Sequence, residues 1–233
     1  MLTFSSSDLV KWSEALASYE KALQCLDNSK LSSLDKWYRE ELPCLIRGRQ
    51  PPYLSQAELK KLMEWKLTRG KWRPGLMKFI SALSEKDVEE ASQKAFAAVP
   101  DLKQAITHLT VLKGVGPATA SAVLAVYAPD VAPFMSDEAM IAALGNAKDY
   151  TLKQYLLLAE KLQNKAKELT GNQNDASSES GTLDWTPSNV ERAIWAISVQ
   201  LKDSNKVEKA GATNDKSESE SKKRLRNGKS KKK

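Results

Sequence analysis

A glycine turn is the first feature of this sequence that could do chemistry. In LKGVGPATASAVL (112–124), Gly114, Val115 and Gly116 predict a tight turn, and Pro117 is tolerated as the first residue of the next helix. A turn that leads into a helix N-terminus presents free amides and the positive end of the helix dipole, which suits a phosphate. Lys113 beside the turn adds a charge. The same glycines also fit an ordinary helical hairpin, in which they only permit close packing.

A basic segment between residues 45 and 78 is the second feature, because nine basic residues there outnumber two acidic ones. Arginine and lysine pair with phosphates, and an aromatic ring can stack on a displaced base. The alternative places the tryptophans of this segment in the core and its charges in solvent. The candidate nucleic-acid contacts in EWKLTRGKWRPG, the densest part, are Lys66, Arg69, Lys71, Trp72 and Arg73.

The glycine turn resembles the helix-hairpin-helix of the DNA glycosylase superfamily, which includes endonuclease III, the adenine glycosylases and the 3-methyladenine glycosylases. Those proteins share an L-x-G-[VI]-G-x-x-T-A core, which is matched here by Leu112, Gly114, Val115, Gly116, Thr119 and Ala120. Their second shared feature is an aspartate further along, at the start of a helix. Asp137, in PFMSDEAM, lies 23 residues after Gly114 and occupies that place. The resemblance covers about residues 106–144.

The resemblance implies two helical subdomains with a cleft between them. The hairpin (about 101–127) would grip the backbone of a damaged DNA strand, with no cofactor beyond a monovalent cation at the hairpin. The target nucleotide would be flipped into the cleft. Asp137 would be the catalytic carboxylate, which stabilises the positive charge that develops on the sugar or activates a water. The implied hairpin contacts are Lys113, Gly114, Val115, Gly116, Pro117 and Thr119.

Three departures from the family pattern limit these expectations. Ala118 stands where members with lyase activity carry a lysine, which excludes a Schiff-base mechanism through that position. No arginine follows Asp137 in EAMIAALG, whereas members often have one there. The chain has two cysteines and one histidine, too few for an iron–sulfur cluster or a Cys/His zinc site, so no metal site is expected.

Asp137 also has a purely structural alternative. Ser136 can cap a helix that begins at Asp137, and the helix dipole favours acidic residues such as Asp137 and Glu138 in a first turn. The two roles are compatible, because a cap would also place the carboxylate at the cleft.

The elements that must hold these residues are predicted to be helices throughout, so the fold class is all-α. Apolar residues recur every three to four positions, and no alternating strand pattern appears. Helices are expected at about 33–42, ending before Pro43, and at 85–98, 101–111, 117–127 and 151–169. Capping boxes are expected at Ser55 with Glu58 and at Ser188 with Glu191.

Charge and composition divide the chain into a helical domain at 1–203 and a disordered basic tail at 204–233. The net charge is +7, and the tail, with eleven basic and four acidic residues, accounts for all of it. A flexible loop is expected at about 171–185, in GNQNDASSESG and the residues after it. No stretch approaches the roughly 18 apolar residues of a membrane span.

The expected function is DNA binding in base-excision repair, with hydrolysis of the N-glycosidic bond of a damaged or mismatched base. The tail KKRLRNGKSKKK (222–233) is typical of a nuclear-localisation signal that an import receptor binds, and equally of a non-specific polyanion contact or a solubilising end. The expected action on DNA, together with the first of these interpretations of the tail, predicts a nuclear location. Two alternatives stay open: a non-catalytic DNA-binding module with the same fold, and a helical interaction protein.

Overall fold

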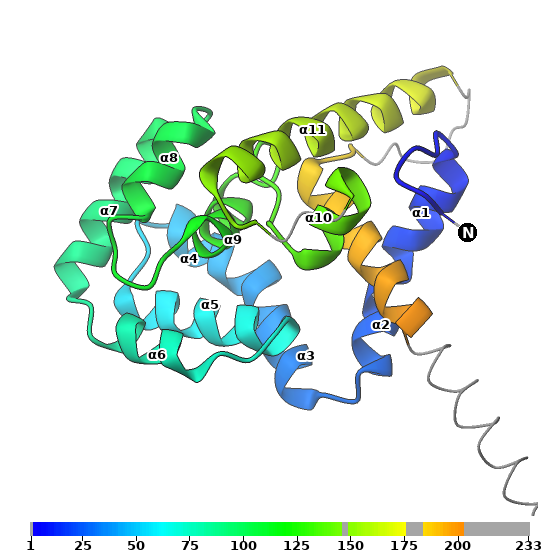
Figure 1. Cartoon of the computed structure of the whole chain (residues 1–233). Helices are drawn as coiled ribbons and strands as arrows, with labels where there is room; N and C mark the ends of the chain where they lie inside the picture. The colour runs from blue at the N-terminus through cyan, green and yellow to red at the C-terminus, as the bar shows by residue number, and fades with distance from the viewer. Residues whose placement is uncertain (1, 146–148, 176–183, 203–233) are drawn as a thin grey trace, which may run out of the picture.

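The chain is built of helices alone in the part that the structure describes. The computed structural model describes residues 2–145, 149–175 and 184–202, and none of them lies in a strand. The prediction of an all-α chain is therefore confirmed over these ranges. The elements (Figure 1) are, in order, α1 (Leu9–Ala17), α2 (Tyr19–Cys25), α3 (Ser29–Lys36), the π-helix η1 (Trp37–Glu41), α4 (Leu42–Arg47), α5 (Gln56–Arg69), α6 (Pro74–Ser81), α7 (Glu85–Ala98), α8 (Leu102–Leu109), α9 (Pro117–Tyr127), α10 (Asp137–Leu144), α11 (Leu152–Asp175) and helical residues 187–202.

Helix α9 lies at the centre of the molecule. Every residue from Thr119 to Val126 is buried, and α4, α5, α8 and α11 contact the helix from different directions (Figure 1). A helix that is apolar on all sides is stable only when other elements surround it. The hairpin at its N-terminus is therefore held by the core of the protein.

Pro43 does not end the helix before it, contrary to the expectation for residues 33–42. Helices α3, η1 and α4 follow one another without a break, and Pro43 stands in the first turn of α4. Proline lacks an amide hydrogen, and its ring collides with the preceding turn of a regular α-helix. The wider π turn at Trp37–Glu41 precedes it, with the Leu42 amide donating to the carbonyl of Trp37.

One of the two expected capping boxes is confirmed and the other is wrong. Ser55 and Glu58 form a complete box at the start of α5. At the last helix, Thr186 accepts from the Asn189 amide at 3.0 Å instead. Ser188 Oγ donates to the carbonyl of Ala132, and Glu191 pairs with Arg69. Both side chains therefore bond to residues distant in the sequence and do not cap the helix.

The prediction of a loop at 171–185 is wrong for its first residues, because α11 continues to Asp175. Residues 176–183 and the predicted basic tail at 204–233 lie outside the described residues. Among the helices that the structure describes, none is both long enough and apolar enough to cross a membrane.

Candidate functional site

Gly114 fixes how the hairpin packs against α6. Its φ is +92°, in the left-handed region that disfavours side chains. A Cβ added there would lie only 2.7 Å from the Cβ of Phe79 on α6. Val115, the next residue, is buried. The first glycine of the motif is therefore required by packing.

Gly116 has the opposite environment. Its φ of −96° suits any residue, and an added Cβ would meet nothing within 4 Å. It is the N-cap residue of α9, and as a glycine it makes no side-chain capping hydrogen bond. The second glycine therefore leaves an open surface at the positive end of a helix.

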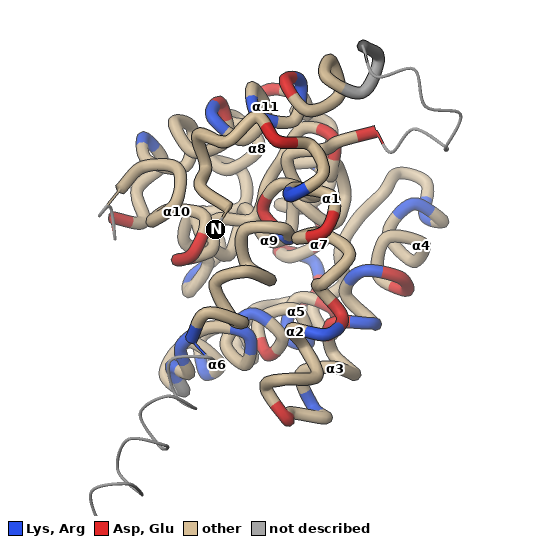
Figure 2. Tube along the Cα trace, turned by 90° about the vertical axis from the view of Figure 1, so that its right-hand side faces the viewer, with Lys and Arg blue, Asp and Glu red and all other residues tan. Residues whose placement is uncertain are grey.

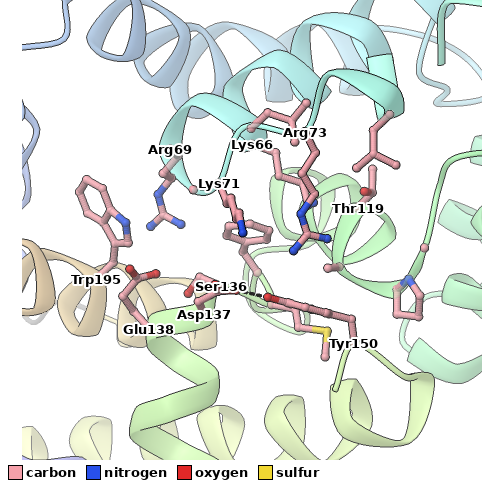
Figure 3. Close-up of a pocket in the computed structure, with 18 of the residues that line it drawn as sticks. Lys66, Arg69, Lys71, Arg73, Thr119, Ser136, Asp137, Glu138, Tyr150 and Trp195 are labelled. Atoms are coloured by element: carbon pink, nitrogen blue, oxygen red, sulfur yellow. Dashed lines mark hydrogen bonds between the residues drawn. The ribbon is translucent and has the colours of Figure 1, made fainter. Parts of the chain in front are cut away.

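That open surface faces a cavity of about 560 Å³, which we call the hairpin cavity (Figure 3). The basic segment, the hairpin and the start of α10 form its walls, together with Tyr150, Trp195 and Lys202. Nine of the twelve residues singled out from the sequence line it: Lys66, Arg69, Lys71, Arg73, Gly114, Gly116, Pro117, Thr119 and Asp137. The structure thus brings together candidates that lie up to 71 positions apart, from Lys66 to Asp137.

The other three candidates lie outside this lining. Lys113 is exposed, with its ammonium nitrogen 5.0 Å from the centre of the Phe79 ring. Val115 is buried, so only its backbone could meet a ligand. Trp72 is 51% exposed, while Trp65, the other tryptophan of the basic segment, is buried in the core.

Arg69 requires a correction, because it is not a free phosphate contact. Its side chain is buried, and Nη1 lies 3.0 Å from Oε1 of Glu191, with a second bond from Nη2 to Oε2 at 3.2 Å. Its guanidinium also lies over the rings of Trp65, Phe134 and Trp195. The charge of Arg69 is therefore compensated inside the protein.

Asp137 lies at the edge of the hairpin cavity with an exposed side chain. Ser136 caps α10, as expected, by accepting from the Ala139 amide at 3.3 Å. The hydroxyl of Tyr150 donates to Oδ1 of Asp137 at 2.5 Å (dashed line in Figure 3). The cap fixes the backbone of Asp137, and Tyr150 restrains its carboxylate.

Tyr150 keeps its proton over the whole neutral range. Burial, and then the hydrogen bond to Asp137, raise the pKa of Tyr150 to about 12. The guanidinium of Arg73 lies 6.0 Å from the centre of the same ring. A hydroxyl that stays protonated holds the neighbouring carboxylate by donation and does not compete with it as a base.

The hairpin cavity has an excess of positive charge. Lys202 pairs with Glu138 at 2.7 Å, and Arg69 is paired with Glu191. Within the described residues, Lys66, Lys71 and Arg73 form no ion pair, although all three extend toward the side of the cavity where Asp137 and Tyr150 lie (Figure 3). In Figure 2 the basic residues likewise crowd the chain around α5 and α6. Asp137 is the remaining carboxylate of the lining, so three free cations face one anion.

Lys66 is the least hydrated of these cations. Burial lowers the pKa of Lys66, the nearby Arg73 lowers it further, and Asp137 acts in the opposite direction. An anion that entered the cavity would therefore relieve an unfavourable charge arrangement.

Sequence reasoning missed several residues that complete this cavity, among them Tyr150, Trp195 and Lys202. Trp195 and Lys202 come from the last helix, and Tyr150 from the segment between α10 and α11. None of them belongs to a motif or to a cluster of charges. The spacing of Tyr150 from Asp137 also follows no helical or strand period, so no signal in the sequence marks the contact.

The monovalent cation expected at the hairpin would need main-chain oxygens as ligands. The carbonyl of Gly116 already accepts from the amides of Thr119 and Ala120, both at 2.9 Å. Ligands would have to come from earlier residues of the turn, and the cation stays a prediction.

Comparison with protein-family models, with curated proteins and with solved structures finds no match to this chain.

Proposed function

We propose that the protein binds DNA and hydrolyses the N-glycosidic bond of a damaged or mismatched base, without a lyase step. One observation carries the proposal: the open N-terminus of α9, three cations without an ion pair among the described residues, and the restrained carboxylate of Asp137 line the same cavity. A phosphate, a sugar and a base could then meet separate partners within one site.

The phosphate of the bound strand would lie at Gly116. A helix N-terminus without a cap attracts an anion through its dipole and its free amides. The open space at Gly116 lets a phosphate approach the backbone, and Lys66, Lys71 and Arg73 supply countercharge. Lys113 and Trp72, on the outside, would contact the flanking strand.

The flipped nucleotide would enter the hairpin cavity. Its volume of about 560 Å³ lies within the range of roughly 300–1,000 Å³ that is usual for small-molecule sites. Leu76, Phe134 and Met135 give the lining apolar surface, against which a base can be held after it leaves the stack.

Asp137 would act on the sugar. As the bond to the base breaks, positive charge grows on the sugar, and a fixed carboxylate stabilises it. The base departs with the bonding electrons and takes up a proton from solvent, and a water adds to C1′ while Asp137 accepts the proton that the water loses. Ala118 also lines the cavity and has no amine, so no Schiff base forms through that residue.

The non-catalytic DNA-binding module remains the second candidate, and one observation favours it. Asp137 opens a helix that Ser136 caps, and there a carboxylate stabilises the helix whether or not it reacts. The two candidates differ only in whether a base is released.

Base release from duplexes that carry alkylated, oxidised, deaminated or mismatched bases tests the proposal. We expect Asp137→Asn to reduce release at least ~100-fold, a loss of about 2.7 kcal/mol of transition-state stabilisation. Asparagine keeps the shape of the side chain and can still accept from Tyr150. Glu138→Gln, which changes a second carboxylate of the same cavity, is the matched control and should retain most of the activity.

Three other outcomes have distinct meanings. Release that Asp137→Asn leaves unchanged removes Asp137 from the mechanism. Absence of release by the parent chain, with DNA still bound, supports the binding module. Failure of a chain shortened after residue 203 to bind DNA at low salt supports the helical interaction protein.

A further inference from the structure

A second cavity, of about 210 Å³, adjoins the hairpin cavity and shares Arg69 and Phe134 with it. Its other walls come from α2, η1, α4, α5, the end of α9 and helical residues 187–202. We call it the arginine cavity, because its lining includes Arg39, Arg47, Arg69 and Arg192. Among the described residues that are proposed to contact DNA, Phe134, which would hold the flipped base, is the one that also lines this cavity.

Two of the four guanidinium groups are neutralised within the protein. Arg69 is paired with Glu191, the carboxylate of the lining, through the two bonds described above. Arg39 lies with Nε 2.6 Å from Oδ2 of the buried Asp35, and it also pairs with Glu20. The acidic groups around the arginine cavity are therefore already in use.

Arg47 and Arg192 carry the charges that remain, since neither forms an ion pair within the described ranges. Arg47 is exposed and donates from Nη2 to the carbonyl of Tyr127 at 3.1 Å. Arg192 donates to the side-chain oxygen of Asn189, but its Nε is buried and has no hydrogen-bond partner in the part of the chain that the structure describes. A buried charged donor without an acceptor is costly, and native proteins rarely leave one unsatisfied.

The electrostatics of Arg192 agree with this geometry. Burial is the main cause that lowers the pKa of Arg192, and the neighbouring guanidinium of Arg39 lowers it further, while Tyr19, Glu191 and Asp35 act in the opposite direction. An anion in the cavity would supply the missing acceptor and screen this repulsion.

The rest of the lining is largely apolar. The rings of Tyr38 and Trp65 are stacked with centres 3.6 Å apart, and Phe134, Pro43 and Pro129 add further surface. The volume equals that of about seven water molecules in the liquid, which limits the ligand to a small molecule. The ligand should therefore have one charged end and a compact apolar body.

We propose that the arginine cavity binds a small organic oxyanion, a carboxylate or phosphate group on an apolar body, through Arg47 and Arg192. Guanidinium groups bind both kinds of oxyanion in bidentate geometry, and the stacked rings take the apolar part. The proposal is independent of the proposed reaction on DNA, because it uses neither Asp137 nor the hairpin.

Calorimetric titration of the full chain with phenyl phosphate and with benzoate, at constant ionic strength, tests this site. We expect at least one of them to bind and to raise the Tm by mass action. We expect Arg47→Gln and Arg192→Gln each to weaken that binding by at least ~10-fold. Arg47 is exposed, so its variant should fold normally even if Arg192→Gln does not.

The controls separate a built site from general attraction to a basic protein. Lys86→Gln removes an exposed charge on α7, outside both cavities, and should leave the affinity unchanged. Benzyl alcohol, which lacks the charge, and inorganic phosphate, which lacks the apolar body, should bind more weakly than the anion that binds best. The proposal is overturned if neither organic anion binds at millimolar concentration. It is also overturned if Arg47→Gln binds as tightly as the parent chain, or if benzyl alcohol or inorganic phosphate binds equally well.

Discussion

The environment of Lys66 disfavours its positive charge, and this lowers the stability of the folded state. It is partly buried, it forms no ion pair among the described residues, and Arg73 repels it. Stability alone would favour an apolar residue at this position. A residue that costs stability while facing a cavity is typical of a functional site.

We therefore predict that Lys66→Met stabilises the fold by about 1 kcal/mol and weakens DNA binding. The folded state lowers the pKa of Lys66, so the unfolded chain binds more protons between the folded pKa and the ordinary value of 10.5. Stability should rise with pH through that window in the parent chain, and the variant should lose this dependence. Thermal unfolding across alkaline pH measures it.

Lys71→Met is the control for that prediction, because Lys71 lines the same cavity but is exposed. It should weaken DNA binding without stabilising the protein. If Lys66→Met destabilises the chain instead, the ammonium contributes to the fold and its proposed role is wrong.

The identity of these residues was predictable to different degrees. Asp137 and the hairpin were found because their spacing matches a family pattern, and the basic segment because its charges are contiguous. Tyr150 could not be found, since its contact with Asp137 depends on how the chain returns between α10 and α11. The pairing of Arg69 was missed because Glu191 lies 122 positions away.

At the scale of the elements, the two glycines of the hairpin have different proposed roles, one in packing and the other in binding. Gly114 packs against Phe79 on α6 in a left-handed conformation, while Gly116 borders the hairpin cavity. The same substitution at the two positions should therefore have different consequences.

We predict that Gly114→Ala destabilises the protein by at least about 2 kcal/mol, from the left-handed backbone and the contact with Phe79. Gly116→Ala should change stability by less than about 0.5 kcal/mol, yet reduce DNA affinity by placing a methyl group where the phosphate approaches. Denaturant unfolding and a DNA titration of both variants test this. Unchanged DNA affinity in Gly116→Ala would show that the turn does not contact phosphate.

The last helix is joined to α5 by the buried pair of Arg69 and Glu191. Both side chains are buried, so the loss of one partner leaves an uncompensated charge in the core. Although burial opposes the charged form, Glu191 raises the pKa of Arg69 above its ordinary value. Arg69 lines both cavities, and Glu191 lines the arginine cavity.

We predict that Arg69→Ala destabilises the protein by about 3–5 kcal/mol, whereas the double variant Arg69→Met with Glu191→Leu loses less. The comparison works because the double variant leaves no buried charge. Urea unfolding of the two proteins gives the values. A double variant that is less stable than Arg69→Ala would mean that the pair itself, and not its imbalance, holds the helix.

Helix boundaries were predicted correctly where nearby residues, such as capping side chains, determine them. Residues 85–98 and 117–127 are helices as predicted, and the box at Ser55 formed. The helix through Pro43 and the pairing of Glu191 depart from the prediction because distant contacts outweigh a local preference. Local preferences can be read from a single sequence, whereas contacts between distant residues leave only indirect traces in it.

At the scale of the whole molecule, charge is divided between a neutral domain and a basic tail, but the domain is not uniform. Basic residues gather along the chain around α5 and α6 (Figure 2), and four of them, Lys66, Arg69, Lys71 and Arg73, line the hairpin cavity. Local charge, and not the net value of +7, is therefore the relevant guide to a DNA-binding face.

We predict that a chain shortened after residue 203 still binds duplex DNA, with a slope of log K against log salt near −3.6. This slope follows if Lys66, Lys71, Arg73 and Lys113 each contact one phosphate, at about 0.9 per phosphate. The full chain should show a steeper slope because of its tail. A slope near zero for the shortened chain would assign all of the salt dependence to residues after 203.

Trp72 gives the protein an optical reporter. The six tryptophans all lie within the described residues; Trp72 is 51% exposed, and the other five are at most 5% exposed. A water-soluble quencher should therefore extinguish mainly the red-shifted part of the emission, which comes from Trp72. Because its neighbours Lys71 and Arg73 line the hairpin cavity, we expect the emission of Trp72 to change when that cavity is occupied.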